Sequence, residues 1–256
     1  MRAKLSDRVS LRRVVNFYRR SLSRQIYEQC GGIVQRGPFT GMRWLDSPRW
    51  GGSEKGVMLL GLYEQEVLNN FVAASSKYRT FVDVGAADGY YAVGFLINGK
   101  VERSIAFEAA EEGRKTIRRL AEKNGVLDKI SILGKASDNF AKDLLSLNVV
   151  PSESMFLVDI EGAEFNVLTE DLLDFLKSSL IIVETHAHIF PDPQGMMDSL
   201  VKRASKTHRI SMWTSGARNP WAIQELDTFT ELDRWILCSE GRIEIQQWLR
   251  FDPIEE

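Results

Sequence analysis

The feature that most constrains this sequence is a repeated alternation of short apolar runs and longer amphipathic segments between residues 80 and 190. Each apolar run has the length and the β-branched or aromatic content of a buried strand. The segment after it has apolar residues at helical spacing. Strands that alternate with helices form a parallel sheet covered on both faces, because a parallel connection needs a crossover. The sequence therefore predicts an α/β fold, with strands at 80–85, 104–109, 129–137, 155–162 and 180–190.

The two ends of the chain differ from this pattern. Before it, the apolar residues of 59–75 have helical spacing and predict a helix. After it, two further strand-like runs, 208–215 and 234–241, predict an antiparallel pair that closes one edge of the sheet. A chain of 256 residues with 44% hydrophobic residues is long enough for one large core. We therefore expect one domain over residues 57–256, preceded by an extension over residues 1–56.

The expected extension contains a basic helix and an aromatic loop. Residues 1–29 carry eight basic and two acidic side chains, with apolar residues at helical spacing. Such a helix could contact an anionic membrane surface, or it could pack on its own domain with a solvated arginine face. Residues 31–56 are irregular and carry Phe39, Trp44 and Trp50, which are candidates for a substrate lid or for packing anchors.

Composition narrows the partners and the compartment. The formal net charge of -2 creates no overall field for a polyanion, so nucleic acid is not the expected partner. Cys30 and Cys238 match no metal-ligand spacing, which favours a reduced, cytoplasmic protein. No apolar run approaches the roughly 20 residues that span a bilayer. A homo-oligomer is compatible with all of these features.

Residues at the carboxyl ends of the first two strands predict a nucleoside site. The first strand ends in a loop that opens with Asp83 and contains Gly85 and Gly89, whose glycines allow sharp turns and a close approach to a ligand. The spacing differs from a dinucleotide fingerprint, and an acid there suits a cationic group such as the ammonium of a methionine-like moiety. Glu108 ends the second strand and is the expected acceptor for ribose hydroxyls.

The segments DVGAADGYY, AFEA, LVDIEGAE and IIVETH, in this order, resemble the FkbM family of class I S-adenosylmethionine-dependent methyltransferases. The resemblance covers roughly residues 80–190, and VDIEGAE is its most specific piece. It implies a Rossmann-like, mostly parallel seven-stranded sheet with a reversed edge strand, and O-methylation of a hydroxyl on a sugar, glycan or natural product. The family often has asparagine at the position of Ala87 and proline at the position of Ala109.

The resemblance also implies roles for individual residues. Asp83, Gly85 and Gly89 would line the methionine part of S-adenosylmethionine, Glu108 would bind the ribose, and Asp159 would lie near the reacting centre. The loop neighbours Ala86 and Ala109 complete the expected donor-binding set. Asp138 is also included in it, because this acid could approach adenine; alternatively it is a solvated loop acid.

Methyl transfer to a hydroxyl requires a group that takes up the proton, so a base or a metal ion is expected near the acceptor. Asp159 and Glu184 end neighbouring strands, and His186 shares a face with Glu184 if the chain stays extended. We expect only one of the two histidines to enter a pocket, and we favour His186 over His188. We expect Asp159, Glu184 and His186 to be catalytic, with Asp159 and Glu184 as candidate Mg²⁺ ligands. Alternatively, Glu184 and His186 hold loops in place by hydrogen bonds.

Two other functions stay open at this point. One is a noncatalytic S-adenosylmethionine-binding module, in which the donor pocket serves structure or sensing. The other is a methyltransferase for another acceptor class, by N-methylation or on nucleic acid.

Overall fold

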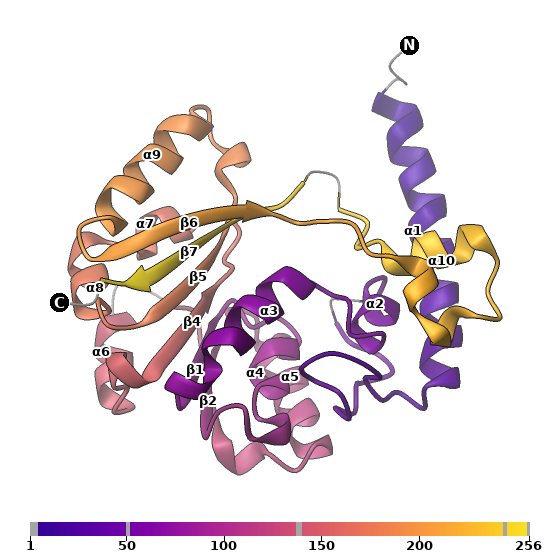
Figure 1. Ribbon diagram of the computed structural model, residues 1–256, viewed down its shortest axis with the longest axis horizontal. Helices are drawn as coiled ribbons and strands as arrows, with labels where there is room; N and C mark the ends of the chain where they lie inside the picture. Colours follow the sequence, from indigo (N-terminus) through magenta and orange to yellow (C-terminus); the bar gives the residue numbers. More distant parts are fainter. Residues whose placement is uncertain (1–4, 50–51, 137–139, 243–244, 255–256) are drawn as a thin grey trace. The chain divides into compact units, whose positions relative to one another are not determined.

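The computed structural model describes residues 5–49, 52–136, 140–242 and 245–254 (Figure 1). The chain divides into two compact units. We call residues 1–65 with 216–244 the N-terminal unit, and residues 66–215 with 245–256 the sheet unit. The division falls after Gln65, whereas the expected boundary falls after residue 56. It also groups residues 216–244 with the N-terminal unit.

The sheet unit contains a seven-stranded sheet in the order β3-β2-β1-β4-β5-β7-β6, which confirms the predicted α/β class. The first five strands are parallel, and β7 runs antiparallel to both of its neighbours. The strand bounds are β1 (Thr80–Val84), β2 (Arg103–Phe107), β3 (Ile130–Leu133), β4 (Ser154–Val158), β5 (Leu180–Thr185), β6 (His208–Thr214) and β7 (Gln247–Pro253).

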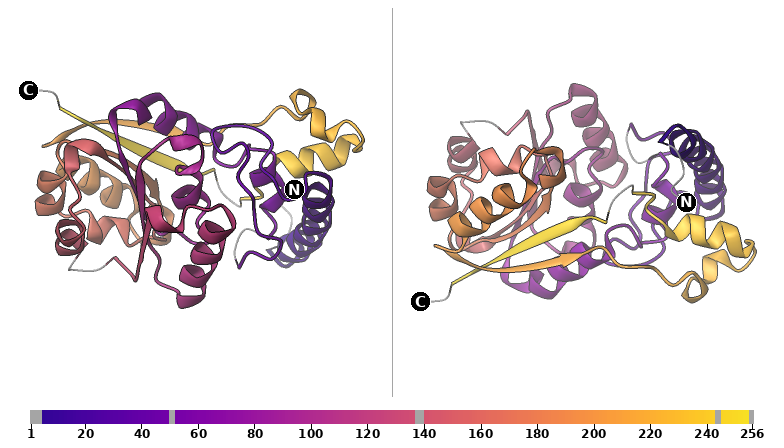
Figure 2. Two further views of the ribbon diagram at one scale, coloured as in Figure 1. Left: turned by 90° about the horizontal axis from the view of Figure 1, so that it is seen from below. Right: turned by 90° about the horizontal axis from the view of Figure 1, so that it is seen from above.

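Helices cover both faces of this sheet (Figure 1), and Figure 2 shows the same layers from two further directions. On one face, Val84, Phe107 and Val158 belong to a buried core with residues of α6 to α9. On the other face, the rings of Phe71 and Phe81 pack edge to face, with their centroids 5.5 Å apart. The α-helices are α3 (Gln65–Ala74), α4 (Tyr90–Gly94), α5 (Glu111–Lys123), α6 (Phe140–Ser146), α7 (Glu164–Val167), α8 (Glu170–Phe175) and α9 (Pro193–Ala204).

Short 3₁₀ turns connect several of these elements. They are η1 (Ser75–Lys77), η2 (Ile97–Gly99), η3 (Leu127–Lys129), η4 (Pro151–Glu153) and η5 (Ala187–Ile189).

The N-terminal unit is built from segments that are far apart in the sequence. The Tyr18 hydroxyl donates to Asp233 at 2.7 Å, and Arg36 pairs with Glu225 at 2.7 Å. Phe39 and Trp44 are buried, which favours their interpretation as packing anchors, whereas Trp50 lies outside the described residues. The helices of this unit are α1 (Leu5–Gln29), α2 (Lys55–Leu59), η6 (Pro220–Ala222), η7 (Gln224–Leu226) and α10 (Glu231–Cys238).

The predicted apolar stripe of the basic helix is only partly buried. Leu22 and Ile26 are buried, whereas Val14 is 65% exposed and the neighbouring Phe17 is 76% exposed. Within the described part of the chain, no helix has the length and apolar character needed to cross a bilayer.

One predicted strand was wrong, and one predicted helix is present as α3 but begins later than expected. Residues 234–241 are not a strand, because α10 occupies Glu231–Cys238; the Thr230 hydroxyl caps its first turn by accepting from the Asp233 amide. The strand that pairs with β6 is β7 instead, and Thr214 lies opposite Gln247 in that pair. The helix expected over 59–75 is interrupted at Gly61, where a Cβ would lie 2.0 Å from a backbone oxygen of Arg36.

Candidate functional site

Four strand ends meet at one edge of the sheet and carry the predicted site residues. In the register, Val84 pairs with Phe107 on one side and with Val158 on the other, and Val158 pairs with Val183. The residues that follow these positions therefore leave the sheet side by side. The strand order reverses between β1 and β4, which is where ligands bind in open parallel α/β sheets.

The glycines of the loop after β1 are required by the packing of the protein itself. Gly85 has a φ of +99°, and a Cβ there would lie 1.7 Å from the carbonyl oxygen of Asp159. The amides of Gly85 and Ala86 both donate to the Phe107 carbonyl, and the amide of Gly89 donates to Ala86. These three amides therefore make hydrogen bonds within the protein, and the glycines allow the sharp turn that brings the ends of β1 and β4 together.

Ala87 holds a backbone conformation that a side chain disfavours, with a φ of 47°. This left-handed conformation costs a non-glycine residue about 1 kcal/mol. We expect Ala87→Gly to raise the free energy of unfolding by about 1 kcal/mol in urea denaturation, because glycine removes the steric strain. The matched control is Ala86→Gly, which lies outside the positive-φ set and should not stabilise the protein; equal stabilisation by both variants would contradict this explanation.

Asp83 lies inside the sheet, one residue before the end of β1. Its carboxylate is buried and accepts a hydrogen bond of 3.0 Å from the Ala92 amide in α4. Burial raises the pKa of Asp83 to about 7; the Ala92 amide acts in the opposite direction, and the charge of Glu108 adds to the increase. The carboxylate therefore faces the backbone of α4, and any contact with a donor ammonium would be indirect.

Glu108 bridges the two loops that were expected to hold the nucleoside. One carboxylate oxygen accepts from the Ala87 amide at 2.9 Å and the other from the Ala110 amide at 2.7 Å. A carboxylate has about four acceptor positions, so about two remain for further donors such as the hydroxyls of a ribose. Ala109 beside it is exposed, and Asp138, the expected adenine contact, lies outside the described residues.

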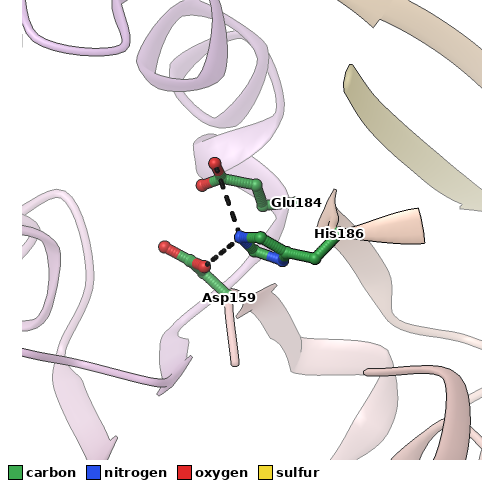
Figure 3. Close-up of side chains that lie close together, drawn as sticks. All are labelled: Asp159, Glu184 and His186. Atoms are coloured by element: carbon green, nitrogen blue, oxygen red, sulfur yellow. Dashed lines mark ion pairs between the residues drawn. The ribbon is translucent and has the colours of Figure 1, made fainter. Parts of the chain in front are cut away.

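The structure also brings the three predicted catalytic residues together (Figure 3). The Nε2 atom of His186 lies 3.7 Å from a carboxylate oxygen of Asp159 and 4.0 Å from one of Glu184. Glu161 reaches the same nitrogen at 3.5 Å, although its side chain is 88% exposed. One ligand atom from each of Asp159, Glu184 and His186 lies within 4.8 Å of the others, so this set could hold a metal ion.

Glu164 has a positioning role that the sequence did not reveal. Its side chain is fully buried, and its two oxygens accept from the amides of Gly162 and His186 at 2.8 and 2.7 Å. The oxygen that takes the His186 amide also lies 3.3 Å from Nδ1 of the same imidazole. Glu164 therefore holds the backbone of His186 by a hydrogen bond and places a carboxylate beside its ring.

The loop that carries Glu164 turns through an unusual backbone. Glu161 and Gly162 have φ values of 54° and 100°, so two successive residues are left-handed. For Glu161 this conformation stores strain, which in proteins is concentrated at functional sites. The turn folds Glu164 back beneath the end of β4, which explains how an acid five residues after Asp159 reaches the neighbouring strand.

Protonation of His186 is governed by the acids around it. Burial lowers its pKa, but the hydrogen bond and charge of Glu164 and the charges of Glu184 and Glu161 outweigh burial, and the net pKa is raised. His188 is exposed, as expected for the histidine outside the site. In an extended strand residues 186 and 188 would share a face, but the chain leaves the extended conformation after Thr185 and enters η5.

The order and direction of the seven strands give a Rossmann-like sheet that is mostly parallel and has one reversed strand, β7. No protein-family model and no curated protein matches the sequence. Among solved structures, it is similar to an O-methyltransferase from Bacillus cereus in complex with SAH, at 12% identity, 73% coverage of this chain, 78% of that chain and a TM-score of 0.49.

Two further solved structures have similar values. An m1A22 tRNA methyltransferase from B. subtilis gives 13% identity, coverages of 73% and 65%, and a TM-score of 0.46. A precorrin-6y C5,15-methyltransferase from Geobacter metallireducens gives 10% identity, coverages of 74% and 89%, and a TM-score of 0.46. These scores are below 0.5, so the fold is defined here by the strand order and register of this chain alone.

Proposed function

We propose that this protein is an S-adenosylmethionine-dependent methyltransferase that methylates a hydroxyl group on a sugar, glycan or natural product. The observation that carries the proposal is that Glu108, Asp159 and Glu184 lie at the carboxyl ends of β2, β4 and β5, on the two sides of the point where the strand order reverses. A nucleoside acceptor and a proton-accepting cluster thus share one edge of the sheet. The FkbM-like segments supply these residues and support a hydroxyl acceptor.

The donor half of the site fits a cationic nucleoside. Glu108 is buried and held by two amides, so its orientation is set before a ribose arrives. Asp83 and Asp159 add negative charge at the ends of β1 and β4, which suits the ammonium and sulfonium groups of the methyl donor. Gly85 keeps these two strand ends in contact, and Ala86, Gly89 and Ala109 shape the adjoining loops.

Catalysis requires little covalent participation from the protein. The methyl group passes from sulfur to the acceptor oxygen by in-line displacement, so alignment of the two substrates supplies much of the acceleration. The acceptor hydroxyl loses its proton during this step, and we assign that proton to the cluster of Asp159, Glu184 and His186. Asp159 and Glu184 also remain the expected ligands for a divalent cation, which would lower the pKa of the acceptor hydroxyl.

The role of His186 leads to a prediction that separates binding from chemistry. We expect His186→Ala to lower the turnover number about 100-fold, because the acceptor proton loses its local partner, while affinity for S-adenosylhomocysteine changes less than about twofold. Steady-state kinetics and calorimetry measure the two quantities. The matched control is His188→Ala, which removes an exposed neighbouring histidine; undiminished turnover in His186→Ala would make His186 a structural residue.

Two experiments test the proposed function itself. Calorimetric titration should show one S-adenosylhomocysteine bound per chain and no binding of NADH. Incubation with S-adenosylmethionine carrying a labelled methyl group and a panel of hydroxylated acceptors should then transfer label. Binding without transfer to any acceptor would favour the noncatalytic module, and absence of binding would refute the proposal.

A further inference from the structure

The cluster around His186 groups several carboxylates about one imidazole. Four carboxylates lie within 4.0 Å of one imidazole, and those of Glu164 and Glu184 are almost fully buried. A protonated imidazole supplies one positive charge. Buried carboxylates are commonly paired with cations or bound to metal ions, so a group of them with a histidine is a candidate metal site.

The two ring nitrogens of His186 have different surroundings. Nδ1 lies against Glu164, a fully buried acid that two backbone amides hold in place. Nε2 points toward Asp159 and Glu184, as Figure 3 shows. A histidine whose one nitrogen faces a fixed carboxylate and whose other nitrogen faces additional acids has the arrangement of a metal ligand with its orienting partner. The side chain is only 7% exposed, so this orientation is built into the fold.

We propose that Asp159, Glu184 and His186 bind one divalent transition-metal ion of the Mn²⁺, Fe²⁺ or Zn²⁺ class, and that Glu164 orients the histidine. The ligand atoms lie within 4.8 Å of one another, whereas atoms bound to one ion at about 2.1 Å are at most about 4.2 Å apart. Side-chain movements of less than about an ångström therefore complete the set. Glu161 is close enough to contribute a further oxygen.

The ligand chemistry distinguishes this ion from the expected Mg²⁺. Mg²⁺ prefers an all-oxygen shell and keeps several waters, whereas imidazole nitrogen favours transition metals. The ligand set does not depend on the methyl donor. Its use in catalysis rests on the proposed function: the ion would bind the acceptor oxygen and lower the pKa of its hydroxyl, and the proton would pass to solvent instead of to the three residues, which are then ligands.

The test uses Mn²⁺ as the probe on full-length protein that has been stripped with EDTA and desalted. We expect one Mn²⁺ per chain, measured by the loss of the free-ion signal in electron paramagnetic resonance, and imidazole nitrogen coupling in the pulsed spectrum. Mg²⁺ should compete only at about 100-fold higher concentration. S-adenosylhomocysteine binding and the thermal midpoint, recorded on the same samples, report whether each variant is folded.

Variants separate the ligands from their neighbours. His186→Ala should remove the nitrogen coupling and weaken Mn²⁺ binding at least about 100-fold, and Glu184→Gln should weaken it similarly. Glu164→Gln should weaken it about 10- to 100-fold, as expected for an orienting partner. The control His188→Ala should keep both the coupling and the affinity, because His188 lies outside the ligand set.

The outcomes for the metal and for the methyl donor are independent. Absence of Mn²⁺ binding in protein that binds S-adenosylhomocysteine would overturn the metal site and leave the proposed function standing. Mn²⁺ binding without S-adenosylhomocysteine binding would do the reverse. Equal affinity for Mg²⁺ and Mn²⁺ with no effect of His186→Ala would overturn the nitrogen ligand.

Discussion

Replacing Glu108 by alanine is expected to weaken the binding of S-adenosylhomocysteine about a thousandfold. The carboxylate is buried, and each of its oxygens already accepts one backbone amide. We assign its remaining acceptor positions to the two ribose hydroxyls. Hydrogen bonds to a charged group contribute about 1.5 to 3 kcal/mol each, and every 1.4 kcal/mol corresponds to about tenfold in affinity.

A ligand that lacks the ribose hydroxyls shows whether Glu108 acts on the ribose. In the unaltered protein, the 2′,3′-dideoxy analogue should bind about a thousandfold more weakly than S-adenosylhomocysteine. In Glu108→Ala the two ligands should bind alike, because the group that distinguishes them is absent. Continued discrimination by the variant would mean that Glu108 only supports the loops, and Glu122→Gln on the exposed face of α5 is the control for a general charge effect.

Asp83→Asn is expected to stabilise the protein at alkaline pH. The pKa of Asp83 rises from 3.8 to about 7 in the folded state, chiefly because of burial. Between these two values the folded protein holds a proton that the unfolded chain has lost, so stability falls as the pH rises through this window. At one pKa unit per 1.36 kcal/mol, the full loss is about 4 kcal/mol above pH 7. Asparagine keeps an oxygen for the Ala92 amide and does not ionise.

The pH dependence distinguishes this explanation from a simple packing effect. The difference in unfolding free energy between Asp83→Asn and the unaltered protein should grow by about 2 kcal/mol between pH 5.5 and pH 8.5. Urea denaturation at the two pH values measures it, and Asp128→Asn at an exposed position is the control. A difference that is constant with pH would rule out titration of Asp83. We also expect weaker S-adenosylhomocysteine binding, since the variant loses negative charge near the ammonium.

The sequence was informative for the centre of the sheet and less so for its last strand. β1, β4 and β5 are buried along their whole length, so they appear as continuous apolar runs. β7 alternates buried with partly exposed residues and ends at Pro253, which weakens its signal. The mistaken strand at 234–241 was rich in apolar residues, and the deciding signal was the capping residue Thr230 with Asp233 three positions later.

In the candidate site, too, some positions could be predicted from the sequence and others could not. Glu108 and Asp159 directly follow β2 and β4, and Glu184 is the second-last residue of β5, so their placement at one edge of the sheet follows from the parallel register. The position of Glu164 depends on two successive left-handed residues, one of which is not glycine, and helical spacing in the sequence does not indicate such a turn. Likewise, the internal use of the Gly85 and Ala86 amides depends on the Phe107 carbonyl, which only the folded sheet places beside them.

Residues 216–244 are inserted between β6 and β7, and the residues that flank this segment lie side by side. Thr214 lies opposite Gln247, and the Ser215 amide donates to the Gln246 carbonyl at 3.1 Å. β6 and β7 thus form a hairpin whose turn has been replaced by a module of another unit. Because β6 and β7 are joined through residues 216–244, β7 can pair with β6 only after that whole segment has been synthesised.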